Sequence, residues 1–456
     1  MDKVNFVILA AGKGTRMRSA LPKVLHKLAG RSMLGHVVAA AESLGEAKKI
    51  IVTGHGAGQV EQQFKSPTTQ FIQQKEQLGT GHAVQMAVPA LCSDAVVIVL
   101  YGDVPLIRPA TIEKILGMVT ETTMGLLTIR LENPQGYGRI VRNSQHEITE
   151  IVEQKDASVE QLKITEVNTG VLALRSSQLR KWLPKITNNN AQGEYYLTDL
   201  VAIARAEGVK VVGVNPESAT EVEGVNNRIQ LSQLERAHQL QLAEHLMESG
   251  TSLADPARFD QRGDLNAGTD NFIDINCVFE GSVTLGNNVS IGANCHISNS
   301  TIGDGVAILP NTVIESAVVG DRAVIGPFAR LRPGTELASD TKVGNFVETK
   351  KAVVGKGSKI NHLSYVGDAQ LGDNVNVGAG TITCNYDGVN KHKTDLGDGV
   401  FVGSNSTLVA PIKVDMGGFI AAGSTVTSEV PSDSLAVGRA KQRNIKGWRR
   451  PTKKEV

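Results

Sequence analysis

Residues 319–343 read VGDRAVIGPFARLRPGTELASDTKV, and an aliphatic residue returns there at every sixth position, from Val319 to Val343. Glycine follows several of the repeated residues, as in the segments VGDR and IGPF. A sustained six-residue period of this kind is typical of a hexapeptide β-helix, in which three hexads form one triangular coil. The stretch therefore predicts a left-handed parallel β-helix.

The same period extends well beyond this stretch, from residue 285 to residue 426. Further repeated positions are Leu285, Ile291, Ile297, Ile302, Ile308, Ile314, Val354, Ile360, Val366, Leu371, Val377, Leu396, Val402, Leu408, Val414, Ile420 and Val426. Two cysteines support the coil geometry, because Cys277 and Cys295 lie 18 residues apart, which is one full coil. Since stacked coils lie about 4.8 Å apart, we expect the two thiols to touch as small core fillers.

The period breaks in two places. Eleven residues separate Val343 from Val354, with GNFVETKK between them, and the segment NYDGVNKHKTD precedes Leu396. Insertions in a repeat array map to loops, often on the binding face. We therefore expect both segments to leave the prism and to mark a site.

The first part of the chain, to about residue 226, alternates between strand-like and helix-like segments. The strand-like runs are VNFVILA, KKIIVTG, AVVIVLYGD, MGLLTIRL, VNTGVLAL and KVVGV, and the helix-like segments include MLGHVVAAAESLG and TGHAVQMAVPALC. Continuous apolar strands between helices favour a mainly parallel sheet covered on both faces, a doubly wound α/β domain. Ligands of such sheets bind at the carboxyl ends of the strands.

A helix is expected between the two parts, because residues 228–249 carry leucines at helical spacing and contain no glycine or proline, the next glycine being Gly250. The predicted organisation is an α/β domain over residues 1–227, a linker helix over residues 228–249 and the β-helix over residues 250–456.

Composition excludes several classes of protein. Lys and Arg total 47 against 46 Asp and Glu, so the net charge of +1 gives no global field that would attract nucleic acid or a membrane surface. No apolar run reaches the roughly 18 residues of a membrane span, and FVILAA is too short for a signal peptide. We therefore expect a soluble cytoplasmic protein. The four cysteines form no CxxC pair, so neither a structural metal site nor a disulfide framework is expected.

The glycine-rich stretch VNFVILAAGKGTRMRSALPK, residues 4–23, matches neither of two well-known phosphate loops. A Walker A loop needs a glycine, then four residues, then a Gly-Lys pair, and no glycine precedes Gly12 in this chain. A dinucleotide fingerprint needs glycine at position 17, where the chain has Met17. Backbone N–H groups near Gly12, followed by Lys13, Arg16 and Lys23, would still suit an anion. The alternative is an ordinary strand-to-helix turn with solvated basic residues.

Many motifs in a fixed order carry a resemblance to one family. They are LAAGKGTRM, LPKVL, EQLGTGHAV, YGDVP, GYGRI, EVNTG, NAQGEYYLTD, EVEGVNN, RLRPG, NFVETKK, HLSYVGD, NVGAGTITCNYDG and VGSNSTLVAP. Nearly end to end, the chain resembles bifunctional bacterial enzymes that join N-acetylglucosamine-1-phosphate uridyltransferase to glucosamine-1-phosphate acetyltransferase. The resemblance implies acetyl transfer from acetyl-CoA to glucosamine 1-phosphate in the β-helix. Uridylyl transfer from UTP to N-acetylglucosamine 1-phosphate would follow in the α/β domain, releasing pyrophosphate.

The resemblance also implies a homotrimer, Mg²⁺ as cofactor, and a product that feeds cell-wall and lipopolysaccharide synthesis. For the α/β domain it implies Arg16 and Lys23 as catalytic residues and Asp103 and Asn226 as Mg²⁺ ligands. The implied ligand-binding residues there are Leu9, Ala10, Ala11, Gly12, Lys23, Gln74, Gly79, Thr80, Tyr101, Gly102, Asp103, Gly138, Glu153, Asn168 and Asn226. Taken alone, Arg16 and Lys23 would be solvated helix residues, and Asp103 or Asn226 could cap a helix.

For the β-helix, the resemblance implies His362 as the general base that deprotonates the amino sugar. The implied glucosamine-1-phosphate residues are Arg332, Glu348, Lys350, Tyr365, Asn376 and Lys391, and the implied acetyl-CoA residues are Ala379, Asn385, Tyr386, Ser404, Ala422 and Arg439. Several lie a coil or more apart, so a neighbouring prism would have to complete the pocket.

Two other readings of the chain remain open from the sequence. The first is a nucleotidyltransferase whose hexads form only an oligomerisation stalk, which would have no reason to carry His362 with Lys350 and Tyr365. The second is a non-catalytic regulatory protein on the same folds, which would be free to lose Arg16, Lys23 and Asp103.

Overall fold

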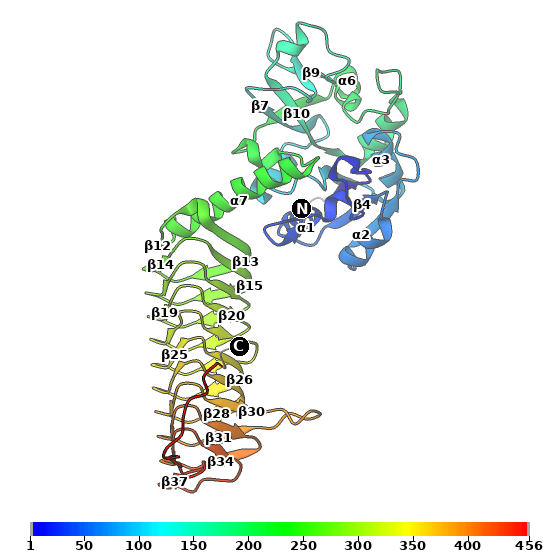
Figure 1. Cartoon of the computed structure of the whole chain (residues 1–456). Helices are drawn as coiled ribbons and strands as arrows, with labels where there is room; N and C mark the ends of the chain where they lie inside the picture. The colour runs from blue at the N-terminus through cyan, green and yellow to red at the C-terminus, as the bar shows by residue number, and fades with distance from the viewer. Residues whose placement is uncertain (1–2, 454–456) are drawn as a thin grey trace. The chain divides into compact units, whose positions relative to one another are not determined.

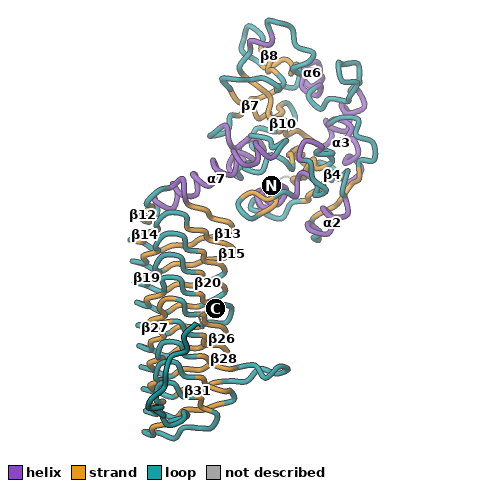
Figure 2. The backbone as a smooth tube through the Cα atoms, in the orientation of Figure 1, coloured by secondary structure: helices purple, strands orange, loops and turns teal. Residues whose placement is uncertain are grey.

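A computed structural model describes residues 3–453, which form two compact units that divide between Gln239 and Leu240. Figure 1 follows the chain through both, and Figure 2 shows mixed helix and strand in the first and short strands joined by turns in the second. Each unit is described by itself below.

The first unit is built on a seven-strand path in the order β11-β7-β10-β6-β1-β4-β5. The strands are β1 (Lys3–Ala10), β4 (Lys48–Thr53), β5 (Thr69–Gln73), β6 (Ala95–Tyr101), β7 (Thr123–Arg130), β10 (Glu166–Arg175) and β11 (Lys210–Val214). Their pairings are parallel except those of β10, which runs antiparallel to β6 and β7. The predicted mainly parallel sheet is confirmed. A hairpin of β8 (Arg139–Arg142) and β9 (Ile148–Val152) extends from β10.

Both faces of this sheet are buried, as doubly wound folds require. Along β1, Val7 and Leu9 belong to one hydrophobic cluster and Phe6 and Ile8 to another, because successive side chains point to opposite faces. The first cluster includes residues of α3 (Thr80–Ala87), α5 (Ser176–Trp182) and α6 (Asp199–Ala206). The second includes residues of α1 (Met33–Glu42), α2 (Ala57–Phe64) and α4 (Pro109–Leu116).

Helix α7 (Arg228–Glu248) lies where a linker helix was expected, and the boundary between the units falls inside it. Its first half belongs to the first unit, where Leu234 packs with Leu28 and Met33. His238 meets His36 edge to face, with ring centroids 5.8 Å apart, and His36 Nε2 donates to the Leu28 carbonyl at 2.8 Å. The functional division at residues 228 and 249 stays a prediction.

The second unit is a parallel β-helix. One sheet contains β12 (Thr251–Leu253), β14 (Asn271–Ile273), β16 (Ser290–Ile291), β19 (Ala307–Ile308), β22 (Val324–Ile325), β25 (Lys342–Asn345), β27 (Lys359–His362), β29 (Asn376–Val377), β32 (Phe401–Val402), β35 (Phe419–Ile420) and β37 (Leu435–Ala436). The other contains β13 (Phe259–Ala267), β15 (Cys277–Leu285), β17 (His296–Ser298), β18 (Thr301–Ile302), β20 (Val313–Glu315), β21 (Val318–Val319), β23 (Arg330–Leu331), β24 (Glu336–Leu337), β26 (Glu348–Val354), β28 (Tyr365–Leu371), β30 (Ile382–Cys384), β31 (Thr394–Leu396), β33 (Thr407–Val409), β34 (Ile412–Val414) and β36 (Thr425–Val426).

The hexad pattern is confirmed residue by residue. Every repeated aliphatic residue from Leu285 to Val426 is buried and belongs to one continuous core. Cys277 and Cys295 are buried in the same core as free thiols, where Cys277 donates to the Gly292 carbonyl at 3.3 Å and Cys295 to the Leu309 carbonyl at 3.4 Å. The neighbouring Cys295 side chain raises the pKa of Cys277. The predicted thiol contact is therefore confirmed.

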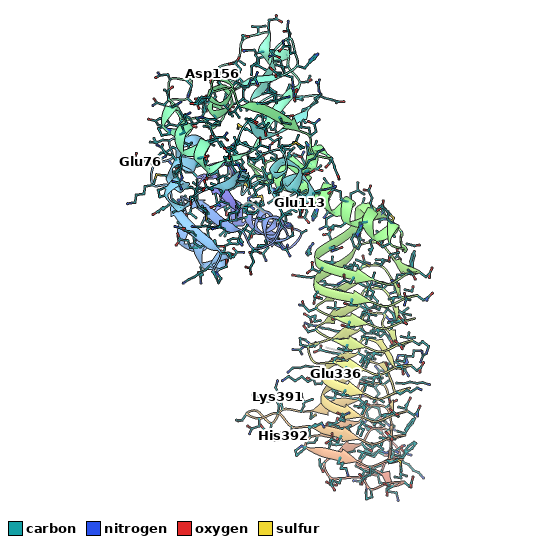
Figure 3. All side chains as sticks on the ribbon, turned by 180° about the vertical axis from the view of Figure 1, so that it is seen from behind. Glu76, Glu113, Asp156, Glu336, Lys391 and His392 are labelled. Atoms are coloured by element: carbon teal, nitrogen blue, oxygen red, sulfur yellow. The ribbon has the colours of Figure 1, made fainter. Side chains whose placement is uncertain are left out.

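One of the two predicted insertions is wrong. Thr349 lies six residues after Val343, is fully buried and pairs with Leu331 and Val366, so GNFVETKK continues the coils with threonine at the inward position. This hexad was missed because its inward residue is a threonine and not the aliphatic residue on which the predicted period rests. The other insertion is confirmed, since the segment that carries Lys391 and His392 projects from the prism in Figure 3.

Two neighbouring valines test the inward packing. Val319→Ala should lower the free energy of unfolding of the β-helix by about 2 kcal/mol, because it empties space in a close-packed core. Val318→Ala is the matched control, since Val318 is 53% exposed and Val319 only 1%. Denaturant unfolding followed by circular dichroism measures both. Equal losses would contradict the inward assignment of the hexads.

The histidine pair on α7 predicts acid sensitivity in the first unit. Burial and the neighbouring His36 lower the pKa of His238 to about 4, although the Glu235 carboxylate acts to raise it. Burial also lowers the pKa of His36, where Arg31 acts in the same direction and Glu235 in the opposite one. Because the unfolded chain binds the proton more tightly, stability should fall as pH drops from about 6.5 to about 4, by at most about 3 kcal/mol.

His238→Gln should flatten this slope, whereas the substitution His245→Gln, at an exposed position in the second half of the same helix, should not. Guanidinium unfolding at several pH values, read from the fluorescence of buried Trp182, measures the slope. An unchanged slope in His238→Gln would rule out this origin.

Candidate active sites

The first candidate site lies where β1 and β6 end beside each other in the sheet, with Leu9 paired to Tyr101. The loop after β1 contains the short helices η1 (Thr15–Met17) and η2 (Lys23–Leu25), which carry Arg16 and Lys23. Asp103 follows β6, and Asn226 precedes α7. The Val225 N–H donates to the Asp103 carbonyl at 2.9 Å, which joins the last two segments.

Four predicted residues meet here from three separate segments of the chain: the loop after β1, the end of β6 and the start of α7. The Lys23 ammonium donates to the Asp103 carboxylate and lies 3.3 Å from Asn226 Oδ1. The Arg16 guanidinium donates to the same Asn226 oxygen at 2.9 Å. The Asp103 carboxylate and the Asn226 amide oxygen thus converge on the lysine ammonium, and oxygen ligands of these two types also suit a divalent metal ion.

Two cavities meet at this cluster. The first, about 230 Å³, is lined by ten predicted nucleotide residues: Leu9, Ala10, Ala11, Gly12, Lys23, Gln74, Gly79, Thr80, Tyr101 and Asp103. The second, about 350 Å³, is lined by Arg16 and Asn226 together with Tyr137, Thr169 and Gly224, and it shares Tyr101 and Asp103 with the first. Two ligands seated in these cavities would therefore meet beside Asp103.

The remaining predicted residues of this site lie close to the two cavities without lining them. Gly102 donates its N–H to the Leu9 carbonyl at 2.9 Å, which joins the ends of β6 and β1. Asn168 donates its N–H to the Gly138 carbonyl at 2.9 Å. The Glu153 carboxylate accepts from Thr198 at 3.2 Å, and burial raises the pKa of Glu153.

Sequence reasoning missed the support behind Tyr101. Burial raises the pKa of this tyrosine, and the carboxylates of Asp103 and Glu153 raise it further. Gly170, with φ +91°, lies so close that an added Cβ would meet the ring of Tyr101 at 2.5 Å. The glycine of the motif EVNTG was the available signal.

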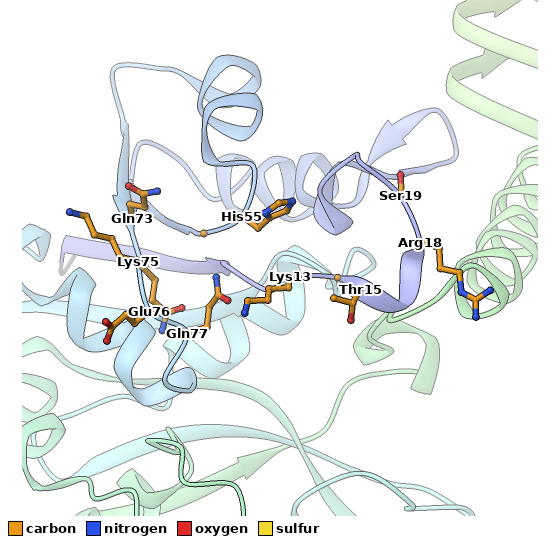
Figure 4. Close-up of a pocket in the computed structure, with 12 residues that line it drawn as sticks. Lys13, Thr15, Arg18, Ser19, His55, Gln73, Lys75, Glu76 and Gln77 are labelled. Atoms are coloured by element: carbon orange, nitrogen blue, oxygen red, sulfur yellow. The ribbon is translucent and has the colours of Figure 1, made fainter.

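A third and larger cavity, about 770 Å³, shares Gln74 and Gln77 with the first. Figure 4 shows Lys13, His55 and Gln77 around it. Its lining also carries Arg18 and Lys75 against the single carboxylate of Glu76, so this approach to the loop is positively charged.

The second candidate site lies on the β-helix. Arg332 and Glu348 form an ion pair at 2.8 Å, and Glu348 lies beside Tyr365 in the β26–β28 ladder. The ammonium groups of Lys350 and Lys391 are neighbours, and Lys350 is the main cause of a lowered pKa at Lys391. Two adjacent ammonium groups favour an anion such as a phosphate.

A column of hydrogen bonds runs down one edge of successive coils from His362. The N–H of Gly380 donates to the His362 carbonyl at 3.2 Å, that of Asn405 to Ala379 at 2.7 Å and that of Gly423 to Ser404 at 2.8 Å. The Arg439 guanidinium then donates to the Ala422 carbonyl. Four of the predicted acetyl-CoA residues therefore line up with the predicted base.

Three predicted residues lie elsewhere. Asn376 is in the other sheet, paired with Lys359 and Phe401, so one chain does not place it with Arg332 and Glu348. Asn385 lies with the sugar-phosphate residues rather than in the column, since it donates to the Asp368 carboxylate and lies 3.5 Å from the Tyr365 hydroxyl. Tyr386 is exposed on the projecting segment.

Sequence reasoning missed two side chains of this site. The first is Asn345, whose Oδ1 lies 2.7 Å from His362 Nδ1, and the second is Asp368. Both lie inside the quoted motifs NFVETKK and HLSYVGD, yet no spacing rule marks them as partners.

Within residues 3–453, no cluster of three or more His, Cys, Asp or Glu side chains could hold a metal ion by itself. A metal at Asp103 would therefore rely on Asn226 and on ligand oxygens. In the same part of the chain, no helix is long and apolar enough to cross a membrane.

Comparisons with known proteins cover both units. Residues 6–151 match the MobA-like NTP transferase domain, and residues 263–344 match the GMPPB C-terminal domain. The chain is 61% identical to "Bifunctional protein GlmU" of Marinobacter nauticus over 453 residues, which are 99% of this chain and 100% of the relative. The proteins of the same name from Cellvibrio japonicus and Acinetobacter baylyi are 56% and 54% identical, over 99% and 98% of this chain and 100% and 98% of their own lengths.

Gly170 offers a clean test of the first site. Gly170→Ala should push Tyr101 from between the two cavities and weaken UTP binding at least tenfold, or about 1.4 kcal/mol. Gly208→Ala is the control, since its φ of +79° imposes similar backbone strain with nothing within 4 Å of the added Cβ. Calorimetric titration with UTP measures both. Equal affinities in the two variants would contradict the role given to Tyr101.

Proposed function

The chain belongs to the GlmU family of bifunctional proteins, and from this premise we propose how its two units divide the work between them. It is a bifunctional enzyme of UDP-N-acetylglucosamine synthesis, with glucosamine-1-phosphate acetyltransferase and N-acetylglucosamine-1-phosphate uridyltransferase activities. We place uridylyl transfer in the first unit and acetyl transfer in the β-helix. The product would supply cell-wall and lipopolysaccharide synthesis.

The observation that carries the first assignment is the convergence of Arg16, Lys23, Asp103 and Asn226 between two cavities. UTP would occupy the cavity lined by Gln74 and Thr80, and the sugar phosphate the cavity beside Tyr137. A phosphate oxygen of the sugar then attacks the α-phosphorus of UTP, and pyrophosphate leaves. Arg16 and Lys23 neutralise the charge that develops on the phosphoryl oxygens, which is the main requirement of phosphoryl transfer.

Nucleotidyltransferases of this kind use a divalent metal ion, and we propose Mg²⁺ held by Asp103 and Asn226. One carboxylate and one amide oxygen, completed by water and ligand phosphates, suit this ion. When bound, it would neutralise phosphate charge beside the two cations. Lys23 would then leave the position between the two oxygens and turn to the phosphates.

The hydrogen bond of His362 supports its role as general base for acetyl transfer. Asn345 Oδ1 can only accept, so Nδ1 of His362 carries the proton and Nε2 keeps its lone pair. Nε2 would take the proton from the amino group of glucosamine 1-phosphate as this nitrogen attacks the thioester carbonyl of acetyl-CoA. The C–S bond breaks, and the thiolate of CoA leaves.

The sugar phosphate would lie on the cluster formed by Arg332, Lys350, Tyr365 and Lys391. Its dianionic phosphate would neutralise the two neighbouring ammonium groups of Lys350 and Lys391. Acetyl-CoA would follow the column from His362 to Arg439. A stalk that served only for oligomerisation would have no use for such a lysine pair.

Exposed apolar side chains beside His362 support the proposed homotrimer. Phe328, Phe346 and Leu363 are 50%, 56% and 63% exposed, and each has positive φ, which strains a bulky residue. Phe346 follows Asn345 and Leu363 follows His362, so this apolar edge adjoins the proposed base. A second prism packed there would cover the edge and could bring Asn376 or the lysine pair of one chain to the histidine of another. The predicted cytoplasmic location stays a prediction.

His362→Ala should lower the rate of acetyl transfer by roughly 10²- to 10⁴-fold, the usual effect of a lost general base, and leave uridylyl transfer intact. His296→Ala, which removes an outward histidine of β17, is the control. The reciprocal variant Asp103→Ala should abolish metal-dependent pyrophosphate release and spare acetylation. Thiol release from acetyl-CoA and pyrophosphate release from UTP measure the two activities. If either variant lost both activities together, the two-site assignment would be wrong.

A further inference from the structure

We propose that Asp368 is a positioning residue of the acetyltransferase site, which orients the Asn385 amide and supplies the negative charge opposite Lys391. This inference rests on the function proposed for the β-helix. Asp368 adjoins Tyr365 and Asn385 in space, yet none of the predicted roles includes it.

The backbone at Asp368 is built to turn its side chain out of the prism. Asp368 has φ +46°, a left-handed conformation that Asp and Asn tolerate better than most residues. The preceding Gly367 donates its N–H to Thr383 Oγ1 at 2.8 Å, and Thr383 is buried at a core position. An inward threonine thus fixes the peptide that presents Asp368.

Gly367 also lets three side chains crowd together. A Cβ on this residue would lie 2.4 Å from the Tyr365 hydroxyl and 2.9 Å from Asn385 Nδ2. Tyr365, Asn385 and Asp368 therefore share one small space above a residue without a side chain. Only glycine at 367 permits this cluster.

The orientation of Asn385 follows from its partners. Its Nδ2 group donates to the Asp368 carboxylate and faces the Tyr365 hydroxyl, and the residue is only 7% exposed. A carboxylate can only accept, so it selects the NH₂ side of the amide. Asn385 Oδ1 must then face away from Asp368, available to accept from the amino group of the sugar.

The charge of Asp368 also acts on Lys391. The groups that act on the Lys391 ammonium are Lys350, which opposes its charge, and Asp368 and Tyr365, which support it. Asn385 begins the projecting segment, and its carbonyl accepts from the His392 N–H at 2.9 Å. The bond from Asn385 to Asp368 therefore also helps to hold the base of the segment that carries Lys391. Loss of the Asp368 charge would leave two ammonium groups without this counter-charge.

Asp368→Asn removes the charge while keeping size and tolerance of positive φ. In the full-length protein it should raise the KM for glucosamine 1-phosphate about tenfold. The increase should grow between pH 7 and pH 9, since Lys391 would lose its proton at lower pH without Asp368. The KM for acetyl-CoA and the uridylyl transfer rate should not change. Asp270→Asn is the matched control, because Asp270 also has a positive φ, of +60°, but is exposed near the start of the β-helix, far along the chain from the candidate site.

The double variant Asp368→Asn with Asn385→Asp again has one carboxylate facing one amide. It should reverse most of the increase in the KM for glucosamine 1-phosphate. Asn385→Asp alone sets two carboxylates face to face and should raise this KM more than Asp368→Asn or the double variant does. Asp368→Asn kinetics identical to those of Asp270→Asn would overturn the proposal. So would a lower kcat at unchanged KM with reduced thermal stability, which would give Asp368 a role in the fold alone. Absence of acetyl transfer from the unchanged chain would overturn the proposed function itself.

Discussion

The stacking of one coil on the next is the constraint on which the β-helix and its candidate site depend. Each inward residue lies on the equivalent residue of the previous coil, so Ile291, Ile308 and Ile325 form one continuous buried row. Because the core fixes the coils in register, it also fixes which outward residues are neighbours. For this reason His362 stacks on Asn345 of the previous coil, and Tyr365 stacks on Glu348. The site needs no loop to position its base, only the repeat.

In the first unit, the carboxyl ends of adjacent parallel strands determine which site residues are neighbours. β1 and β6 are adjacent, so the glycine-rich loop and Asp103 reach one edge together. Asn226 arrives from outside the sheet and is held at the start of α7, where Gln230 accepts its N–H at 2.8 Å. The last half of α7 serves the other unit, whose core contains Ala243 and Leu246. One helix therefore contributes to the edge of a catalytic site and to the end of a β-helix.

Much of this could be predicted from the sequence where the signal was periodic or local. The hexads, the continuous apolar strands and the linker helix all follow from patterns that burial against a core imposes on the sequence. The reversal of β10 left no such mark, since a buried strand reads the same in either direction. Thr349 and Thr383 were missed because a buried polar residue breaks an aliphatic period without breaking the coil.

The site residues divide in a similar way. Resemblance supplied Lys23, Asp103 and Asn226 as a group, and the structure brings them together. It also grouped Asn376 with Arg332, although the fold of one chain puts them on different sheets. Asp368 and Asn345 could not be found, because their importance lies in which side chain they face, and facing depends on coil register.

The central claim is that each unit holds one complete fold and one activity. The direct measurement is to produce residues 1–239 and residues 240–456 as separate proteins and to assay both reactions in each. The first should release pyrophosphate from UTP and N-acetylglucosamine 1-phosphate without acetylating, and the second should acetylate glucosamine 1-phosphate without consuming UTP. If either reaction appears only when the two pieces are joined in one chain, the claim is contradicted.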